Sequence, residues 1–215
     1  MLIKPLGLTE YESAFEAMRR FTDERNADTG DELWLTEHPP VYTVGLAGRD
    51  EHLPRAGHAA ARGIPVVRCD RGGQVTYHAP GQAIAYALLD LSRRALGVRR
   101  LVWLLEQSVI DLLESYNFEA SRRAGAPGVY VNGAKVASLG LRVRRGCCYH
   151  GLALNVDMDL TPFLAIDPCG FPGLEVTQLR SLGLAENFAA VSRALGNAVA
   201  ARLEPETRSP RSAHP

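Results

Sequence analysis

The stretch that decides the fold is Val129-Tyr130-Val131-Asn132-Gly133-Ala134-Lys135-Val136-Ala137. Two apolar runs flank Asn132-Gly133, the dipeptide that most strongly favours a two-residue hairpin turn because both positions accept a positive φ. We therefore expect two antiparallel strands here. Further apolar runs at 141–144 and 152–156 predict two more strands. This half of the chain is thus expected to form a largely antiparallel sheet.

The N-terminal half of the chain adds strands to this pattern. Short apolar runs bounded by Gly, Pro and charged residues predict strands at 33–35, 41–44, 64–67, 75–78 and 84–91. The last two are separated by Pro80-Gly81, which predicts a second hairpin. Residues 46–63 are rich in Gly, Ala and charge, which is typical of a loop or a short helix.

Three segments have the 3.6-residue periodicity of amphipathic helices. The first follows Thr9-Glu10-Tyr11-Glu12, whose Thr-x-x-Glu spacing predicts a capping box. The others are expected at 98–116 and 185–203. The sequence therefore predicts an α/β (α+β) fold: a single domain with a mixed, mostly antiparallel sheet flanked by helices. We expect this domain to span residues 1–203 and the proline-rich end, 204–215, to be a disordered tail.

Composition excludes several classes of function. The 24 Lys and Arg balance the 24 Asp and Glu, which argues against a nucleic-acid partner. No apolar run approaches 20 residues, so no membrane span is expected, and the N-terminus lacks the pattern of a signal peptide. Four cysteines without Cys-x-x-Cys spacing predict free thiols in the cytoplasm and no metal site.

The first candidate for chemistry is Cys169, in Asp167-Pro168-Cys169-Gly170-Phe171-Pro172-Gly173. Proline fixes φ and glycine permits close backbone approach, so this turn is suited to hold a thiol beside free backbone N–H groups. The alternative is a buried structural cysteine, the interpretation that we keep for Cys69, Cys147 and Cys148. The turn favours a nucleophile, which needs a base or a cation to activate it.

Lys135 is the second candidate, just after the predicted Asn132-Gly133 turn. A lysine there is usually a solvated edge charge. The small residues that follow, Ala137-Ser138-Leu139-Gly140, leave room for a ligand. If Lys135 points into a pocket beside Cys169, its ammonium stabilises the thiolate and can later transfer a proton.

Two further segments favour a binding site. Arg71-Gly72-Gly73 ends a strand in a loop that can approach a ligand closely, although no Gly-Lys-Ser/Thr follows and it is no phosphate loop. Along 75–78, Thr76 and His78 are expected on one face of the strand, with Val75 and Tyr77 on the other. In 150–155 the small residues Gly151 and Ala153 leave space between leucines, which suits an acyl chain or a tightly packed strand.

With these segments in order, the chain closely resembles the lipoyl(octanoyl) transferases, that is, the octanoyl-[acyl-carrier-protein]:protein N-octanoyltransferases. The resemblance spans about residues 2–203 and rests on three ordered motifs, 71–82, 133–155 and 167–179. It implies the fold of lipoate ligases and biotin protein ligases. It also implies transfer of an octanoyl group to a target lysine through an acyl-thioester, with no ATP and no metal cofactor.

The resemblance also implies roles for individual residues. Cys169 would form the thioester and Lys135 would assist it. The substrate pocket would comprise Arg71, Gly72, Gly73, Gln74, Val75, Thr76, Tyr77, His78, Ser138, Leu139, Gly140, Gly151, Leu152 and Ala153. The donor would be octanoyl-acyl carrier protein. The acceptors would be lipoyl domains of 2-oxoacid dehydrogenase E2 subunits and the glycine cleavage H protein.

Two alternatives remain at this stage. An ATP-dependent lipoate ligase shares the fold but needs no nucleophilic cysteine, so the Pro-Cys-Gly turn speaks against it. A catalytically inactive module that binds acyl groups or lipoyl domains would be expected to lack Cys169 or Lys135, and both are present. The arginine pairs at 93–94, 99–100 and 144–145 are solvated surface charges or contacts for the acidic carrier protein.

Overall fold

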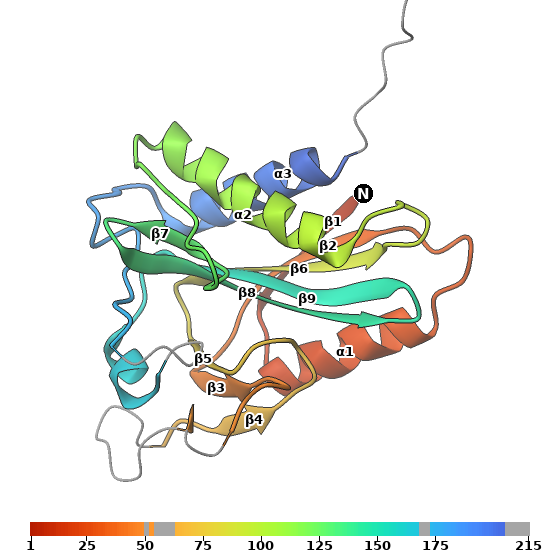
Figure 1. Ribbon diagram of the computed structural model, residues 1–215, viewed down its shortest axis with the longest axis horizontal. Coiled ribbons are helices and arrows are strands. Elements are labelled where there is room, and N and C mark those ends of the chain that lie inside the picture. The colour runs from red at the N-terminus through yellow and green to blue at the C-terminus, as the bar shows by residue number, and fades with distance from the viewer. Residues whose placement is uncertain (50–51, 54–62, 168–172, 205–215) are drawn as a thin grey trace, which may run out of the picture.

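A mixed sheet, six-stranded in the described residues, forms the centre of the molecule (Figure 1). The computed structural model describes residues 1–49, 52–53, 63–167 and 173–204. The strands of this sheet are β1 (Leu2–Leu8), β2 (Glu32–Glu37), β6 (Gln82–Asp90), β7 (Val129–Val131), β8 (Ala134–Arg144) and β9 (Cys147–Asn155). Their order is β1-β2-β6-β9-β8-β7, and only the β1–β2 pair is parallel. The predicted mixed, mostly antiparallel architecture is confirmed.

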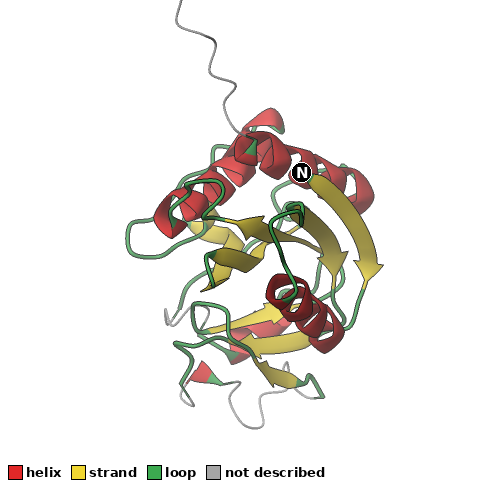
Figure 2. Ribbon diagram, turned by 90° about the vertical axis from the view of Figure 1, so that its right-hand side faces the viewer, coloured by secondary structure: helices red, strands yellow, loops and turns green. Residues whose placement is uncertain are grey.

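In the described part of the chain, a smaller sheet and four helical segments complete the fold. The smaller sheet has the order β4-β3-β5, with β3 (Val41–Val44), β4 (Val66–Arg68) and β5 (Val75–His78). The helices are α1 (Tyr11–Asp23), α2 (Val98–Ser115), α3 (Phe188–Leu203) and the short 3₁₀ helix η3 (Thr161–Ala165). Helices α2 and α3 cover one face of the large sheet, and α1 lies on the other side (Figure 2).

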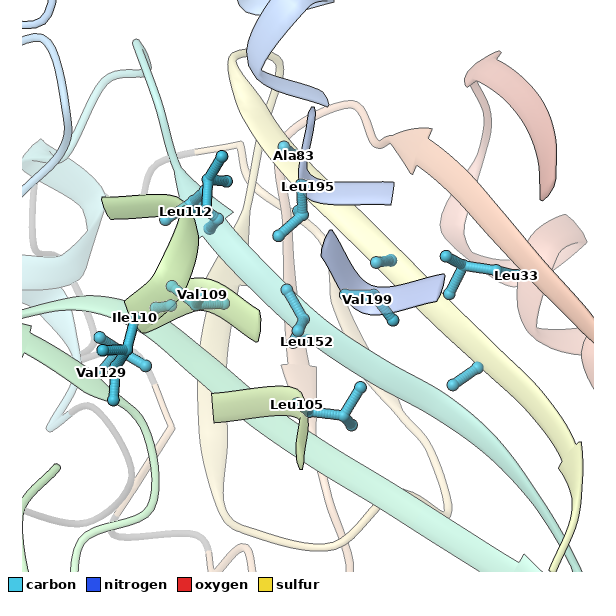
Figure 3. Packing of buried hydrophobic residues seen from close by; sticks show 14 of the residues in the cluster. Leu33, Ala83, Leu105, Val109, Ile110, Leu112, Val129, Leu152, Leu195 and Val199 are labelled. Atoms are coloured by element: carbon cyan, nitrogen blue, oxygen red, sulfur yellow. The ribbon is translucent and has the colours of Figure 1, made fainter. Parts of the chain in front are cut away.

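The main core lies between the large sheet and the helices α2 and α3 (Figure 3). Leu105 and Val109 of α2 and Leu195 and Val199 of α3 pack there against alternate residues of the strands, including Leu152 of β9. Each leucine removed from water in this way contributes roughly 1.5–3 kcal/mol. On the opposite face, a second cluster of Ala14, Met18, Trp34, Ile84, Tyr86, Leu88, Tyr149 and Ala153 joins α1 to the sheet.

The predicted Asn132-Gly133 hairpin is confirmed. Asn132 and Gly133 have φ values of 51° and 83° and join β7 to β8, as a two-residue turn with two positive φ angles requires. The runs expected as separate strands at 135–137 and 141–144 are one continuous strand, β8. The turn therefore places Lys135 near the beginning of the longest strand in the sheet.

The second predicted hairpin is wrong. Pro80-Gly81 does connect β5 to β6, but the two strands belong to different sheets: β5 pairs with β3, and β6 pairs with β2 and β9. A turn signal shows that the chain changes direction, whereas the pairing partner is set by side chains far away in the sequence. The chain crosses here from the small sheet to the large one.

The predicted capping box is also wrong. Helix α1 begins at Tyr11 with Glu10 in the cap position and without a side-chain cap hydrogen bond. Thr9 is still tied to the strands, because its N–H donates to Glu37 O at 2.9 Å and its hydroxyl to Leu6 O at 3.3 Å. Thr9 therefore lies in the short link between β1 and α1, and its side chain does not cap the helix.

The last helix ends where the sequence predicts, and two predicted segments lie largely outside the described residues. Helix α3 ends at Leu203, the predicted end of the domain, and the predicted tail lies outside the described residues apart from Glu204. Most of 46–63 also lies outside them. Among the helices that are described, none is long and apolar enough to cross a bilayer.

Candidate active site

Lys135 is a buried cation on the strand that follows the hairpin turn. Its exposed fraction is 1%, and it is one of only two lysines in the sequence. Its Nζ donates to Pro127 O at 3.0 Å and lies 5.4 Å from the centre of the Tyr130 ring. Because the side chain is buried, Lys135 is not a solvated edge charge. Burying an ammonium is costly unless carbonyl oxygens or charges surround it, and the Pro127 carbonyl supplies one such partner.

The chain that follows the Pro-Cys-Gly motif is hydrogen-bonded to Lys135 itself. Lys135 N–H donates to Glu175 O at 2.8 Å, and Thr177 N–H donates to Lys135 O at 2.9 Å, which forms a parallel bridge with Val176. Cys169 lies outside the described residues, which resume at Gly173. In sequence, Cys169 is four residues before Gly173 and two residues after Asp167.

A cavity opens on the α1 side of the large sheet, facing β5 of the small sheet. About 490 Å³ of unoccupied space, part of it open to solvent, lies within its lining. Eleven of the fourteen predicted pocket residues line it: Arg71, Gly73, Gln74, Thr76, His78, Ser138, Leu139, Gly140, Gly151, Leu152 and Ala153. The structure therefore brings together residues from three separate segments, 71–78, 138–140 and 151–153, and their contact with substrate stays a prediction.

Three of the predicted residues do not line this cavity. Val75 and Tyr77 point away from it into a separate core with Tyr42 and Phe163, as the alternation along β5 predicts. Gly72 is turned toward the large sheet, where its N–H donates to Leu141 O at 2.8 Å. These three residues lie behind the cavity wall and do not line the cavity itself.

Arg71 fixes the loop that forms one wall of the cavity. Its guanidinium donates to Thr43 O at 2.7 Å, to Gln74 O at 2.9 Å and to Gly72 O at 3.0 Å. It also donates to the Thr43 hydroxyl at 2.9 and 3.2 Å. These bonds hold the loop against β3, so the main role visible for Arg71 is to shape the cavity wall.

A buried chain of hydrogen bonds runs from the cavity to the Lys135 region. His78 Nδ1 donates to Gln82 Oε1 at 2.6 Å, and Gln82 Nε2 donates to Asn155 Oδ1 at 2.9 Å. Asn155 Nδ2 in turn donates to Thr177 O at 2.9 Å. Because Thr177 N–H also donates to Lys135 O, one chain of hydrogen bonds connects the cavity with the backbone of the buried lysine.

Four residues that sequence reasoning did not assign to the pocket also line the cavity: Tyr11, Ile84, Tyr86 and His150. Tyr86 donates to His38 Nε2 at 2.6 Å, and His38 Nδ1 donates to Thr9 O at 2.6 Å. The signal available for Tyr11 was a phenolic hydroxyl on the apolar stripe of a helix. Nothing local marked Tyr86, which sits in a continuous apolar strand.

His150 lines the cavity, and its backbone has a φ of 62° within β9. Its Nε2 donates to Asp70 Oδ1 at 3.1 Å, and the Tyr149 hydroxyl donates to the other oxygen of the same carboxylate. Burial lowers the pKa of His150, while Asp70 acts in the opposite direction. The hydrogen bonds from His150 and Tyr149 hold the pKa of Asp70 below its usual value against the effect of burial.

Two buried histidines near the cavity predict sensitivity to acid. Burial lowers the pKa of His78 to about 3 and that of His38 to about 4, whereas both titrate near 6.5 in an unfolded chain. Between these values the unfolded chain binds protons that the folded chain excludes. The free energy of unfolding should therefore fall as the pH drops below about 6.5, by on the order of 1.4 kcal/mol per pH unit for each histidine.

Urea unfolding measured at pH 7.5, 6.0 and 5.0 checks this expectation. The His38→Gln variant should show a shallower dependence on pH, because it removes one of the two groups. A free energy of unfolding that stays constant from pH 7.5 to pH 5.0 would contradict the burial of neutral histidines.

Comparison with known proteins shows a family match over most of the chain. Residues 10–200 match the family described as Lipoyl protein ligase A/B catalytic domain. The chain is 60% identical over 199 residues to an octanoyltransferase of Thiobacillus denitrificans, across 93% of this chain and 89% of that protein. It is also 60% identical over 201 residues to an octanoyltransferase of Nitrosococcus oceani, across 94% of this chain and 88% of that protein.

Solved structures show the same fold at low sequence identity. A lipoate-protein ligase A bound with ATP superposes with a TM-score of 0.75 at 13% identity, covering 94% of this chain and 85% of that chain. A biotin protein ligase from Aquifex aeolicus in complex with biotin and ATP gives a TM-score of 0.56 at 14% identity, covering 94% and 69%. The predicted likeness to the fold of both ligase groups is confirmed.

Proposed function

The chain belongs to the lipoyl protein ligase A/B catalytic domain family and, within it, to the octanoyltransferases, and from this we propose a two-step mechanism. As a transferase of octanoyl groups for protein lipoylation, it would take the group from octanoyl-acyl carrier protein. The group would be held as a thioester on Cys169 and passed to the target lysine of a lipoyl domain. Neither ATP nor a metal ion takes part.

The observation that carries the proposal is the bridge between Lys135 and the chain that follows the Pro-Cys-Gly motif. Hydrogen bonds from Lys135 N–H to Glu175 O and from Thr177 N–H to Lys135 O join the two segments. They hold the strand that carries the buried ammonium beside residues 175–177, which follow the Cys169 motif in the sequence. A cation near a thiol favours the thiolate, the reactive form.

The first step exchanges one thioester for another. The Cys169 thiolate attacks the carbonyl carbon of the octanoyl group, and a C–S bond to Cys169 forms as the C–S bond to the carrier's phosphopantetheine breaks. The departing sulfur takes up one proton, which the Lys135 ammonium supplies. The step is close to neutral in free energy because the bond that forms is of the same kind as the bond that breaks.

The second step forms an amide. The amine of the acceptor lysine attacks the enzyme thioester, a C–N bond forms, and Cys169 leaves as the thiolate. The neutral Lys135 amine takes the proton that the attacking amine loses, which restores the thiolate and ammonium pair. Since an amide is more stable than a thioester, the step needs no phosphate anhydride.

The cavity is our candidate for the octanoyl group. Lys135 and the wall residues Ser138, Leu139 and Gly140 lie on the same strand, so the wall begins about 10 Å along β8 from the lysine. That separation suits an extended eight-carbon chain whose carbonyl lies beside Lys135. Apolar lining by Ile84 and Leu152 would favour its methylene groups.

A transfer assay with two donors tests the proposal. The purified chain is mixed with a lipoyl-domain protein and either octanoyl-acyl carrier protein without ATP or free octanoate with ATP and Mg²⁺. We expect an octanoyl-lysine on the acceptor only with the thioester donor. Transfer that requires ATP would indicate a ligase, and no transfer from either donor would indicate a binding module.

A further inference from the structure

A buried glutamate on the helix layer is connected to Lys135 through a single peptide group. Glu106 of α2 has an exposed fraction of 6%, and its Oε1 accepts the Gly128 N–H at 2.9 Å. The Pro127 carbonyl, which belongs to the same peptide group, accepts Lys135 Nζ at 3.0 Å. A trans peptide directs its N–H and C=O to opposite sides. Glu106 and Lys135 therefore bind the two ends of one peptide plane.

The direction of this peptide dipole matches the charges at its ends. The carboxylate of Glu106 faces the positive N–H end, and the ammonium of Lys135 faces the negative carbonyl end. Each interaction strengthens the other, because hydrogen bonds in a buried chain polarise one another. Removing the carboxylate would take away one of the hydrogen bonds that fix this peptide plane and would weaken its carbonyl as an acceptor for Nζ.

Gly128 is required for this arrangement. Its φ is 140°, and a Cβ at this position would lie 2.6 Å from Ala137 O and 2.9 Å from Lys135 Cε. The backbone therefore approaches the lysine stem more closely than any other residue type permits. This packing holds the Pro127–Gly128 peptide against the Lys135 side chain, which the peptide orients.

Glu106 is itself held in place by a network on its outer side. Its Oε2 accepts Arg122 Nε at 3.0 Å. Arg122 also donates to Gln107 Oε1 at 2.8 Å and to Trp103 O at 3.1 Å, and its guanidinium lies 4.8 Å from the Trp103 ring. With one oxygen on Arg122 and the other on Gly128, the carboxylate has little freedom to turn.

We infer that Glu106 is a positioning residue for Lys135 that acts through the Pro127–Gly128 peptide. The inference rests on the proposed function in one respect, the role of Lys135. That role is to hold Cys169 as a thiolate and to move protons at its thioester. Glu106 touches no substrate. It affects the reaction only by setting the position of the Lys135 ammonium and the charges around it.

The test compares Glu106→Ala and Glu106→Gln with Lys135→Met, using two measurements. The first is the rate of octanoyl transfer, which we expect to fall roughly ten- to hundredfold in Glu106→Ala, the scale of a misplaced catalytic group. Glu106→Gln keeps an oxygen for Gly128 N–H and should retain more of the rate. In the Lys135→Met background, Glu106→Ala should cause no further loss.

The second measurement is the pH profile of Cys169 alkylation, followed by peptide mass spectrometry. It does not depend on octanoyl transfer. Both Lys135→Met and Glu106→Ala should move the profile to higher pH, the latter by less. Glu114→Gln is the matched control, since it removes an exposed carboxylate on the same helix without touching the Glu106–Arg122–Gln107 network in any described hydrogen bond.

The outcomes separate the two ideas. A profile that moves in Lys135→Met but not in Glu106→Ala would overturn the role of Glu106 and leave the proposed function standing. Losses of rate that add in the double variant would also overturn it, because they indicate a purely structural effect. A profile unchanged in both variants would remove Lys135, and Glu106 with it, from activation of the thiol.

Discussion

Replacing Cys169 with serine is expected to abolish octanoyl transfer, with the rate falling by about 10³-fold or more. A serine hydroxyl at neutral pH carries almost no alkoxide, so it cannot replace a thiolate that attacks a thioester. Intact-protein mass spectrometry after mixing with octanoyl-acyl carrier protein should show an octanoyl adduct on the unaltered chain. The adduct should be absent from Cys169→Ser.

The other cysteines supply the matched controls. Burial raises the pKa of Cys148 to about 12 and also raises that of Cys147, so neither thiol is ionised appreciably at neutral pH. Cys147→Ser should therefore keep both the adduct and the transfer rate. If Cys169→Ser transferred octanoyl at the rate of the unaltered chain, the nucleophile would have to be another residue.

Replacing Lys135 with methionine is expected to have the second largest effect. Methionine fills the space of the lysine stem, so packing against Gly128 and Tyr130 is largely kept while the ammonium is lost. Loss of a proton-transferring group lowers rates by roughly 10²- to 10⁴-fold. Single-turnover kinetics should show that acylation of Cys169 and transfer to the acceptor are both slowed.

The pH dependence of alkylation tells a direct role from a structural one. Without the ammonium, Cys169 should react with iodoacetamide only at higher pH. Lys4→Met is the control, because Lys4 forms a partly buried ion pair with Glu32 at 2.7 Å at the opposite edge of the sheet from β7. An alkylation profile that is the same in Lys135→Met as in the unaltered chain would remove Lys135 from the activation of the thiol.

Local sequence signals predicted those features of the fold that depend on local geometry. Asn132-Gly133 predicted its hairpin correctly because positive φ values at two adjacent residues are a property of the turn itself. Pro80-Gly81 predicted a hairpin that does not exist, because the partners of β5 and β6 are chosen by side chains across the molecule. The capping box failed for a similar reason, since Thr9 is held by Glu37 in another strand.

The candidate site divides in the same way. Glycine-rich segments marked most of the cavity wall, because small residues leave space wherever they are placed. Tyr86 faces the cavity from the middle of a continuous apolar strand, where no local pattern distinguishes it from a core residue. The burial of Lys135 was equally hidden, since it depends on the Pro127 carbonyl and on a segment forty residues later in the chain.

The most direct test of the proposed mechanism is to isolate the octanoyl-enzyme and ask whether it is a competent intermediate. The adduct is freed of carrier protein by gel filtration and mixed with a lipoyl-domain protein in the absence of ATP. The account predicts that the octanoyl group leaves Cys169 and appears on the acceptor lysine at least as fast as the overall reaction proceeds. An adduct that stays on the enzyme, or that maps to a residue other than Cys169, would contradict it.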